Sequence, residues 1–153
     1  MEIVRERRLE APPASIWPLV AEVERLPEWF TFAERVELLA GEGAGRRQRI
    51  HGRWGKKRSE VDQLVTDFEP ERLLAWQHEA ERLDGKPAPR FAKETRFAIR
   101  LEPDGKGTRV RLESHQEPAG PVRGLVMRLF GTREVAGHME RSLERLAAAI
   151  RDG

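Results

Sequence analysis

The sequence contains no cysteine, no tyrosine and no asparagine. The absence of cysteine excludes disulfide bonds, thiolate zinc sites and cysteine nucleophiles. No apolar run approaches the ~20 residues that a membrane-spanning helix needs. The N-terminus, Met1 to Arg8, is interrupted by charged side chains and lacks the apolar stretch of a secretion signal. We therefore expect a cytoplasmic protein.

The sequence also lacks a large excess of charge of one sign. It contains 28 basic and 26 acidic residues, which leaves a net charge of +2. Without cysteine or tyrosine nothing titrates between histidine and lysine, so this small excess persists and gives a pI near 9.4. The high pI therefore does not indicate the dense positive field of a nucleic-acid-binding protein. The preference for arginine over lysine is typical of thermophilic proteins or of GC-rich genes.

The 153 residues have the size of one domain, which we place over residues 1–153. Imperfect alternation predicts a charged strand over residues 2–10. Helical spacing follows from residue 13 and ends at Leu26-Pro27, which predicts short helices after the first strand. From about residue 34 to residue 117, alternating segments are separated by glycine- and proline-rich turns, the pattern of successive antiparallel strands.

The pattern changes near the C-terminus. A period of 3.6 residues runs from Val122 through Leu125, Val126 and Leu129 to Ile150 and predicts one long helix that covers the sheet, with Gly131 marking a bend. The fold class is therefore α+β. We expect a curved antiparallel sheet of about seven strands wrapped around the C-terminal helix, with two short helices after strand 1.

Alternation over residues 90–102 places one set of side chains on a covered face and the other set in solvent. The covered face, the helix that faces it and the aromatic segment after the short helices would line any cavity between sheet and helix. The expected ligand-binding residues are Trp29, Phe32, Trp76, His78, Phe91, Lys93, Thr95, Phe97, Val110, Leu112, Ser114, Phe130 and Met139. The alternative is that these side chains fill a solid core.

Polar residues that alternate with the covered side of the strands are the candidates for ligand binding or catalysis. Thr95, Ser114 and Gln116 need hydrogen-bond partners there, which a ligand or water could supply. Lys93 and His78 are the candidate catalytic residues, since a buried amine acts as a nucleophile or base and an imidazole as a general acid or base. The alternatives are a lysine that reaches solvent or pairs with a carboxylate, and a hydrogen-bonded wall histidine.

Metal and cofactor sites are not expected. The four histidines, His51, His78, His115 and His138, have none of the short spacings of metal ligands. No serine–histidine–aspartate spacing and no phosphate-binding glycine motif is present.

The segment 46–58 contains seven lysines and arginines and no acidic residue, which suggests a surface for nucleic acid or an anionic membrane. The segment also alternates as a strand, with Arg47, Arg49, His51 and Arg53 on a solvated face and Ile50 and Trp54 inward. The net charge of only +2 argues against nucleic acid as the partner.

Several motifs together resemble the SRPBCC superfamily of START-like, helix-grip proteins, especially its polyketide cyclase/dehydrase and lipid-transport branch. The motifs are Ala11-Pro12-Pro13-Ala14-Ser15-Ile16-Trp17, Leu26-Pro27-Glu28-Trp29-Phe30, Phe68-Glu69-Pro70-Glu71-Arg72-Leu73-Leu74-Ala75-Trp76, Gly107-Thr108-Arg109-Val110 and Leu143-Glu144-Arg145-Leu146. The resemblance implies a deep, largely apolar cavity between sheet and helix. It does not fix an activity, because the superfamily includes carriers, receptors, cyclases and chaperone cofactors.

The leading hypothesis is a carrier or sensor that binds a hydrophobic small molecule or lipid, without metal or cofactor, with Glu81–Pro89 and Trp29–Phe32 as candidate lids. One alternative is a polyketide cyclase or aromatase in which His78 or Lys93 assists proton transfer. Another is a module that binds protein or RNA through the basic segment 46–58. Each fully buried methylene contributes about 0.8 kcal/mol to binding an apolar ligand.

Overall fold

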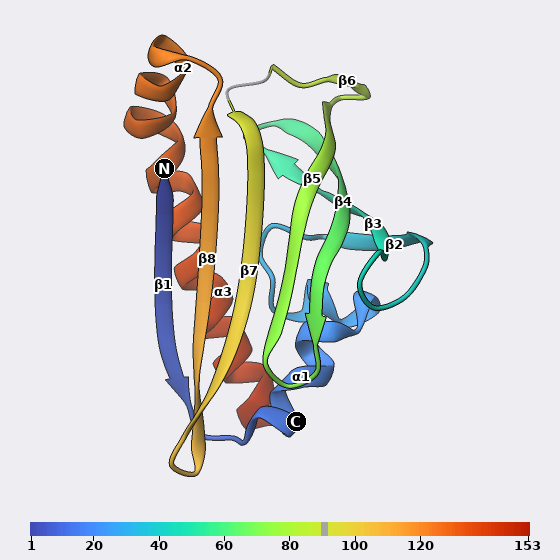
Figure 1. Ribbon diagram of the computed structural model, residues 1–153, viewed down its shortest axis with the longest axis vertical. Helices are drawn as coiled ribbons and strands as arrows, with labels where there is room; N and C mark the ends of the chain where they lie inside the picture. Colours follow the sequence, from blue (N-terminus) through green and yellow to red (C-terminus); the bar gives the residue numbers. More distant parts are fainter. Residues whose placement is uncertain (90–91) are drawn as a thin grey trace.

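The chain folds into one antiparallel sheet crossed by a long helix, in a computed structural model that describes residues 1–89 and 92–153, apart from the side chain of Phe130. The strands lie in the order β1-β8-β7-β5-β4-β3-β2, with β6 paired to β5. Figure 1 shows α3 behind β8 and the short helix α1 near the lower end of the sheet. The elements are β1 (Glu2–Leu9), α1 (Pro13–Ala21), the 3-10 helix η1 (Val23–Glu28), β2 (Arg35–Ala40), β3 (Arg47–Trp54), β4 (Lys57–Glu69), β5 (Leu73–Leu83), β6 (Lys86–Pro87), β7 (Ala92–Asp104), β8 (Gly107–Pro118), α2 (Pro121–Val126), the π-helix η2 (Met127–Gly131) and α3 (Thr132–Asp152). The α+β helix-grip architecture expected from the sequence is confirmed.

The core forms between α3 and the face of the sheet turned toward it, which we call the inner face. The second half of the predicted helical stripe is buried as expected, at Ala136, Met139, Leu143 and Leu146. On the sheet the buried partners alternate along each strand, as at Phe97, Ile99 and Leu101 in β7 and at Val110, Leu112 and Ser114 in β8. The buried apolar side chains of both layers form one cluster with those of α1.

The first half of the C-terminal stripe does not cover the sheet as predicted. Val122, Leu125, Val126 and Leu129 are exposed. The helix changes to π geometry over η2, where each turn holds an extra residue. This rotates the preceding residues by roughly a quarter turn relative to a continuous α-helix, so their apolar face no longer points at the strands.

Trp54, which the sequence places on the inward side of its strand, is not buried. Its neighbours in the same strand phase, Ile50 and Gly52, are buried, but Trp54 is exposed. Trp54 is the last residue of β3 and pairs with Lys57 across the two-residue turn to β4. At this end of the hairpin the inner face is no longer covered, so an inward phase does not give burial.

The segment between η1 and β2 joins the short helices to α3. The indole Nε1 of Trp29 donates a hydrogen bond of 2.8 Å to the carbonyl of Leu19. The backbone N–H of Thr31 donates to Ser142 Oγ at 3.0 Å, and the Thr31 hydroxyl lies 2.7 Å from His138 Nδ1. The ring of Phe32 stacks on His138 with centroids 4.6 Å apart. These contacts hold Phe32 at the edge of the inner face.

The same segment passes directly over β3 at Gly52. A Cβ atom at this position would lie 2.4 Å from the carbonyl oxygen of Phe32, and the backbone N–H of Glu34 donates to the carbonyl of His51 at 2.8 Å. Two backbones therefore touch at Gly52, and no side chain fits between them.

We predict that Gly52→Ala destabilises the protein by about 1–3 kcal/mol, the usual cost of overpacking a filled site. Gly131→Ala is the matched control, because it has open space around its Cβ position and helical backbone angles. The control should stabilise by about 0.5–1 kcal/mol, since alanine favours a helix over glycine. Urea denaturation measures both, and equal effects of the two substitutions would contradict the contact.

A second prediction concerns pH. Burial lowers the pKa of His138, and the charge of Arg141 acts in the same direction, while Glu134 opposes it. The unfolded chain therefore takes up this proton first as the pH falls, so folding stability should decrease below the ordinary histidine value of 6.5. Denaturation between about pH 7 and pH 5 should show a shallower loss of stability in His138→Gln than in the wild type. An identical slope in both proteins would show that His138 titrates normally.

Candidate functional site

The centre of the inner face is filled by aromatic rings. Trp76 stacks on Phe97 with centroids 5.3 Å apart, and Phe30 meets both rings edge-on at 5.5 and 5.3 Å. Each ring comes from a different element, namely β5, β7 and the segment after η1. Other residues expected to line a cavity are buried in the same core, namely Trp29, Val110, Leu112 and Met139. In this structure these side chains pack against one another.

The start of β7 and the end of β8 lie at the upper end of the sheet in Figure 1, and inward-phase side chains there are only half-buried. Thr95 and Gln116 are cross-strand neighbours on β7 and β8, in the phase of the buried Phe97 and Ser114, yet both are half-buried. Within the described part of the chain, neither the Thr95 hydroxyl nor the Gln116 side-chain amide has a hydrogen-bond partner. These polar groups are therefore free to bond water or a ligand.

His78 stands on the neighbouring strand β5, in the same phase as Trp76. Its Nδ1 lies 3.0 Å from Glu81 Oε1. In a regular strand residues three apart point to opposite faces, but the pairing of β4 with β5 shifts between Asp62 and Gln63 and leaves Glu79 as an extra residue. The bulge brings Glu81 to the side of His78. Sequence alternation does not reveal this partner, since nothing in it marks the bulge.

Lys93 does not point toward the inner face as predicted. The side chain is exposed, and its Nζ lies 3.8 Å from Glu117 Oε1. The pairing of β7 with β8 shifts between Ala92 and Glu94, so Lys93 is the extra residue of a bulge and leaves the alternation seen from Thr95 onward. The pairing with a carboxylate that the sequence left open is the arrangement observed.

Of the other residues expected to bind a ligand, the structure describes the side chains of Phe32 and Ser114. Phe32 is half-buried, with its ring 6.1 Å from that of Phe97. Ser114 is buried opposite Phe97. Phe91 and the side chain of Phe130 lie outside the described residues.

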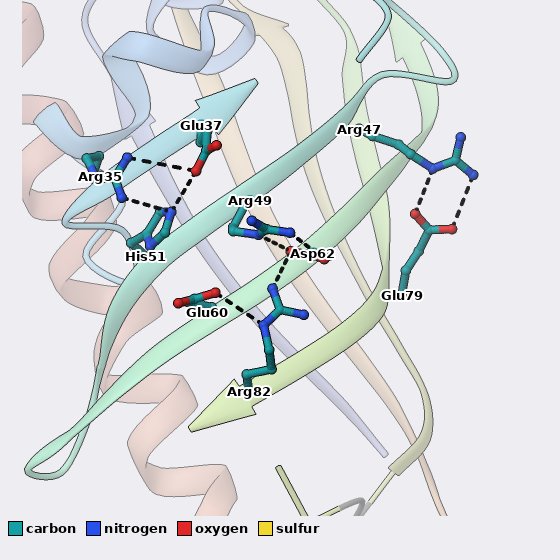
Figure 2. A network of polar contacts seen from close by, with 9 residues as sticks. All are labelled: Arg35, Glu37, Arg47, Arg49, His51, Glu60, Asp62, Glu79 and Arg82. Atoms are coloured by element: carbon teal, nitrogen blue, oxygen red, sulfur yellow. Dashed lines mark hydrogen bonds and ion pairs between the residues drawn. The ribbon is translucent and has the colours of Figure 1, made fainter. Parts of the chain in front are cut away.

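The basic segment 46–58 is matched by carboxylates from neighbouring strands. Arg49 Nε donates to Asp62 at 2.6 Å, and Arg82 also reaches Asp62, at 2.9 Å. Figure 2 shows these contacts beside the pairs of Arg47 with Glu79 and of His51 with Glu37. The hydrogen bond from Arg49 and then that from Arg82 lower the pKa of Asp62 against the opposing effect of burial. Much of the strand's positive charge is therefore neutralised.

Arg46, at the start of this segment, is buried instead of solvated. Its Nη1 donates to the carbonyl of Ala21 at 2.7 Å, and its Nε donates to Gln48 Oε1 at 3.0 Å. The guanidinium lies 5.9 Å from the centroid of the Phe68 ring. Burial lowers the pKa of Arg46, and the negative charge of Glu24 opposes this. The side chain ties β3 to the end of α1.

Hollows also indent the surface outside the aromatic centre of the inner face. One of about 290 Å³ is lined by the side chains Glu6, Arg100, Glu102, Arg109, Arg111 and Glu113. Arg100 and Arg111 each lie 2.8 Å from Glu113 there. The other, of about 350 Å³, lies beside the buried Arg46 and is lined by residues of the α1–η1 junction and of β2. Among the described residues no group of histidines and carboxylates is arranged to hold a metal ion. Within the same residues no helix is long and apolar enough to span a membrane.

Solved structures share this fold over nearly the whole of this chain. TTHA0849 from Thermus thermophilus is 22% identical, with 99% of this chain and 98% of that chain covered and a TM-score of 0.77. Ara h 8.0201 is 13% identical, with 100% and 99% covered and a TM-score of 0.76. DynU16, from the dynemicin biosynthetic locus, is 17% identical with a TM-score of 0.68, over 98% of this chain and 47% of that chain. At these identities the likeness shows the fold alone.

Sequence comparison gives the family. A search of curated proteins finds no match. The family model described as "Polyketide cyclase / dehydrase and lipid transport" matches residues 1–151, which is nearly the whole chain. The chain therefore belongs to the polyketide cyclase/dehydrase and lipid transport family of the SRPBCC superfamily.

Proposed function

We propose that the protein is a cytoplasmic carrier or sensor that binds a hydrophobic small molecule at the partly covered end of the inner face. The observation that carries the proposal is the pair of Thr95 and Gln116, whose polar groups lie in the inward strand phase next to Phe97 and have no partner among the described residues. Apolar binding sites typically combine aromatic walls with a few such polar groups, which orient the ligand. The family description, which includes lipid transport, agrees with this chemistry.

The ligand would lie against the aromatic rings of the inner face and direct one polar group toward Thr95 and Gln116. Phe32 is the side chain that must make room, because it is half-buried at the edge of the face and contacts Phe97 and His138. Trp76 and Phe97 are fixed by stacking and form the floor. Each methylene transferred from water to this surface contributes about 0.8 kcal/mol.

We predict that Thr95→Trp blocks binding by filling the space above Phe97. Arg96→Trp is the matched control, because it adds the same ring one residue away on the exposed face of β7. Titration with an anilinonaphthalene sulfonate dye should show at least about tenfold weaker binding for Thr95→Trp and little change for the control. Equal affinities in the two variants would overturn this location.

A second candidate function is general acid–base catalysis on the bound molecule, as in a polyketide cyclase. The observation that favours it is the 3.0 Å contact of His78 Nδ1 with Glu81, because a carboxylate that orients one imidazole nitrogen leaves the other to exchange protons. The reaction would be an intramolecular aldol condensation of a poly-β-ketone. His78 Nε2 takes a proton from an activated methylene, the new carbanion attacks a carbonyl carbon of the same chain, and the imidazolium returns the proton to the resulting alkoxide.

The test is the cyclisation of a synthetic poly-β-ketothioester, followed by mass spectrometry and absorbance. His78→Gln should slow turnover by about 10²–10⁴-fold if histidine is the base. The same variant should leave dye binding nearly unchanged. A wild-type rate equal to that of His78→Gln would leave carriage or sensing as the function.

A further inference from the structure

The segment that forms α2 and η2 exposes large apolar side chains. Val122, Leu125 and Leu129 are 76%, 55% and 62% exposed, although a continuous helix would have turned them toward the sheet. Single exposed apolar residues are ordinary, but successive ones on adjoining helical turns form a patch that normally marks a binding surface.

The packing of α2 against β8 explains why the side of the helix with Val122, Leu125 and Leu129 points outward. A Cβ atom at Gly124 would lie 3.1 Å from the Pro118 side chain, so the helix rests on the end of β8 through its glycine. Met127 is buried on the same helical segment. The Thr132 hydroxyl donates to the carbonyl of Met127 at 3.1 Å, which ties η2 to the start of α3. The apolar patch is thus the side opposite these contacts.

The charge of the segment is one-sided. Residues 119–133 contain Arg123, Arg128 and Arg133 and no aspartate or glutamate, whereas the whole chain has a net charge of only +2. Arg128 and Arg133 are exposed. Apolar side chains flanked by arginines, in a segment without acidic residues, complement an anionic lipid surface, where the chains enter the interface and the arginines meet phosphates.

The hairpin between β3 and β4 also presents an exposed apolar side chain beside basic residues. Trp54 is 46% exposed at the end of β3, and it is followed by Lys56 in the turn and Lys57 at the start of β4, both exposed. In Figure 1 the hairpin between β3 and β4 lies toward the same end of the long axis as α2. Tryptophan beside lysine is a typical side-chain combination at a membrane interface.

We infer that this end of the protein docks on an anionic lipid bilayer, with Val122, Leu125 and Leu129 inserted as the main contact and Trp54 as a second one. The docking surface lies at the end where Thr95 and Gln116 are partly uncovered. The inference goes beyond ligand binding and stands even if the inner face binds nothing, because it rests only on the exposed surface.

The test is co-sedimentation of the full chain with vesicles of phosphatidylcholine alone and of phosphatidylcholine mixed with phosphatidylglycerol. We expect binding to the anionic vesicles that weakens as salt is added. The double variant Leu125→Glu with Leu129→Glu should lose at least about tenfold in affinity. Leu38→Glu is the matched control, since Leu38 is also 55% exposed but lies on β2, and it should bind as the wild type does.

Further variants test separately the contribution of the arginines and that of Trp54 to vesicle binding. Arg128→Gln with Arg133→Gln should weaken binding by about tenfold or more on anionic vesicles, while Arg151→Gln, at the exposed end of α3, should change it little. Trp54 emission should shift to the blue on vesicle addition, with a Trp54→Phe sample used for subtraction. An unshifted Trp54 emission would remove the hairpin from the docking surface.

Two results would overturn the inference. One is binding of the Leu125/Leu129 variant equal to that of the wild type. The other is a dimer in analytical ultracentrifugation that the same variant abolishes, with no vesicle binding by the wild type, since a second copy would then be the occupant of the patch. Dye binding that survives in this variant would show that ligand binding and docking are separate properties.

Discussion

The fold depends on burying the apolar inner face of the sheet under α3, because η2 and α2, which continue this helix, turn several of their large apolar side chains outward. α3 has 21 residues and a length of about 31 Å, whereas the 13 residues of β7 extend over about 43 Å. The aromatic cluster of Trp76, Phe97 and Phe30 fills the covered part. The remaining part is left to residues that tolerate partial exposure, which explains why Thr95 and Gln116 occur there in an inward phase.

Sequence periodicity was sufficient for the covered part of the molecule. The alternation through Phe97, Ile99 and Leu101 and the helical spacing through Met139, Leu143 and Leu146 each reflect one regular geometry repeated over many residues. The prediction failed where a single residue interrupts that geometry. The bulge at Lys93 reverses its direction, the bulge at Glu79 gives His78 its partner, and the π turn exposes Leu125.

The basic segment shows a different limit. Residues 46–58 contain no acidic side chain, so the sequence suggested an anion-binding surface. In the sheet, Arg47 and Arg49 lie beside carboxylates that come from β5 and β4. Charge balance across strands depends on register, which a local count of charges does not contain. Segment 119–133 likewise contains arginines and no acidic side chain, and its helical periodicity predicted burial of the apolar residues that the structure exposes.

The π turn at Met127–Gly131 also bears on how such a surface arises in evolution. A π turn differs from an α-helical turn by one additional residue. Deleting one residue between Met127 and Gly131 would restore regular helical spacing and rotate Val122 and Leu125 back toward the strands. A single codon insertion is therefore enough to convert a helix that closes the end of the sheet into one that presents its apolar side to the outside. Relatives can be sorted by the length of this segment before any of their structures is known.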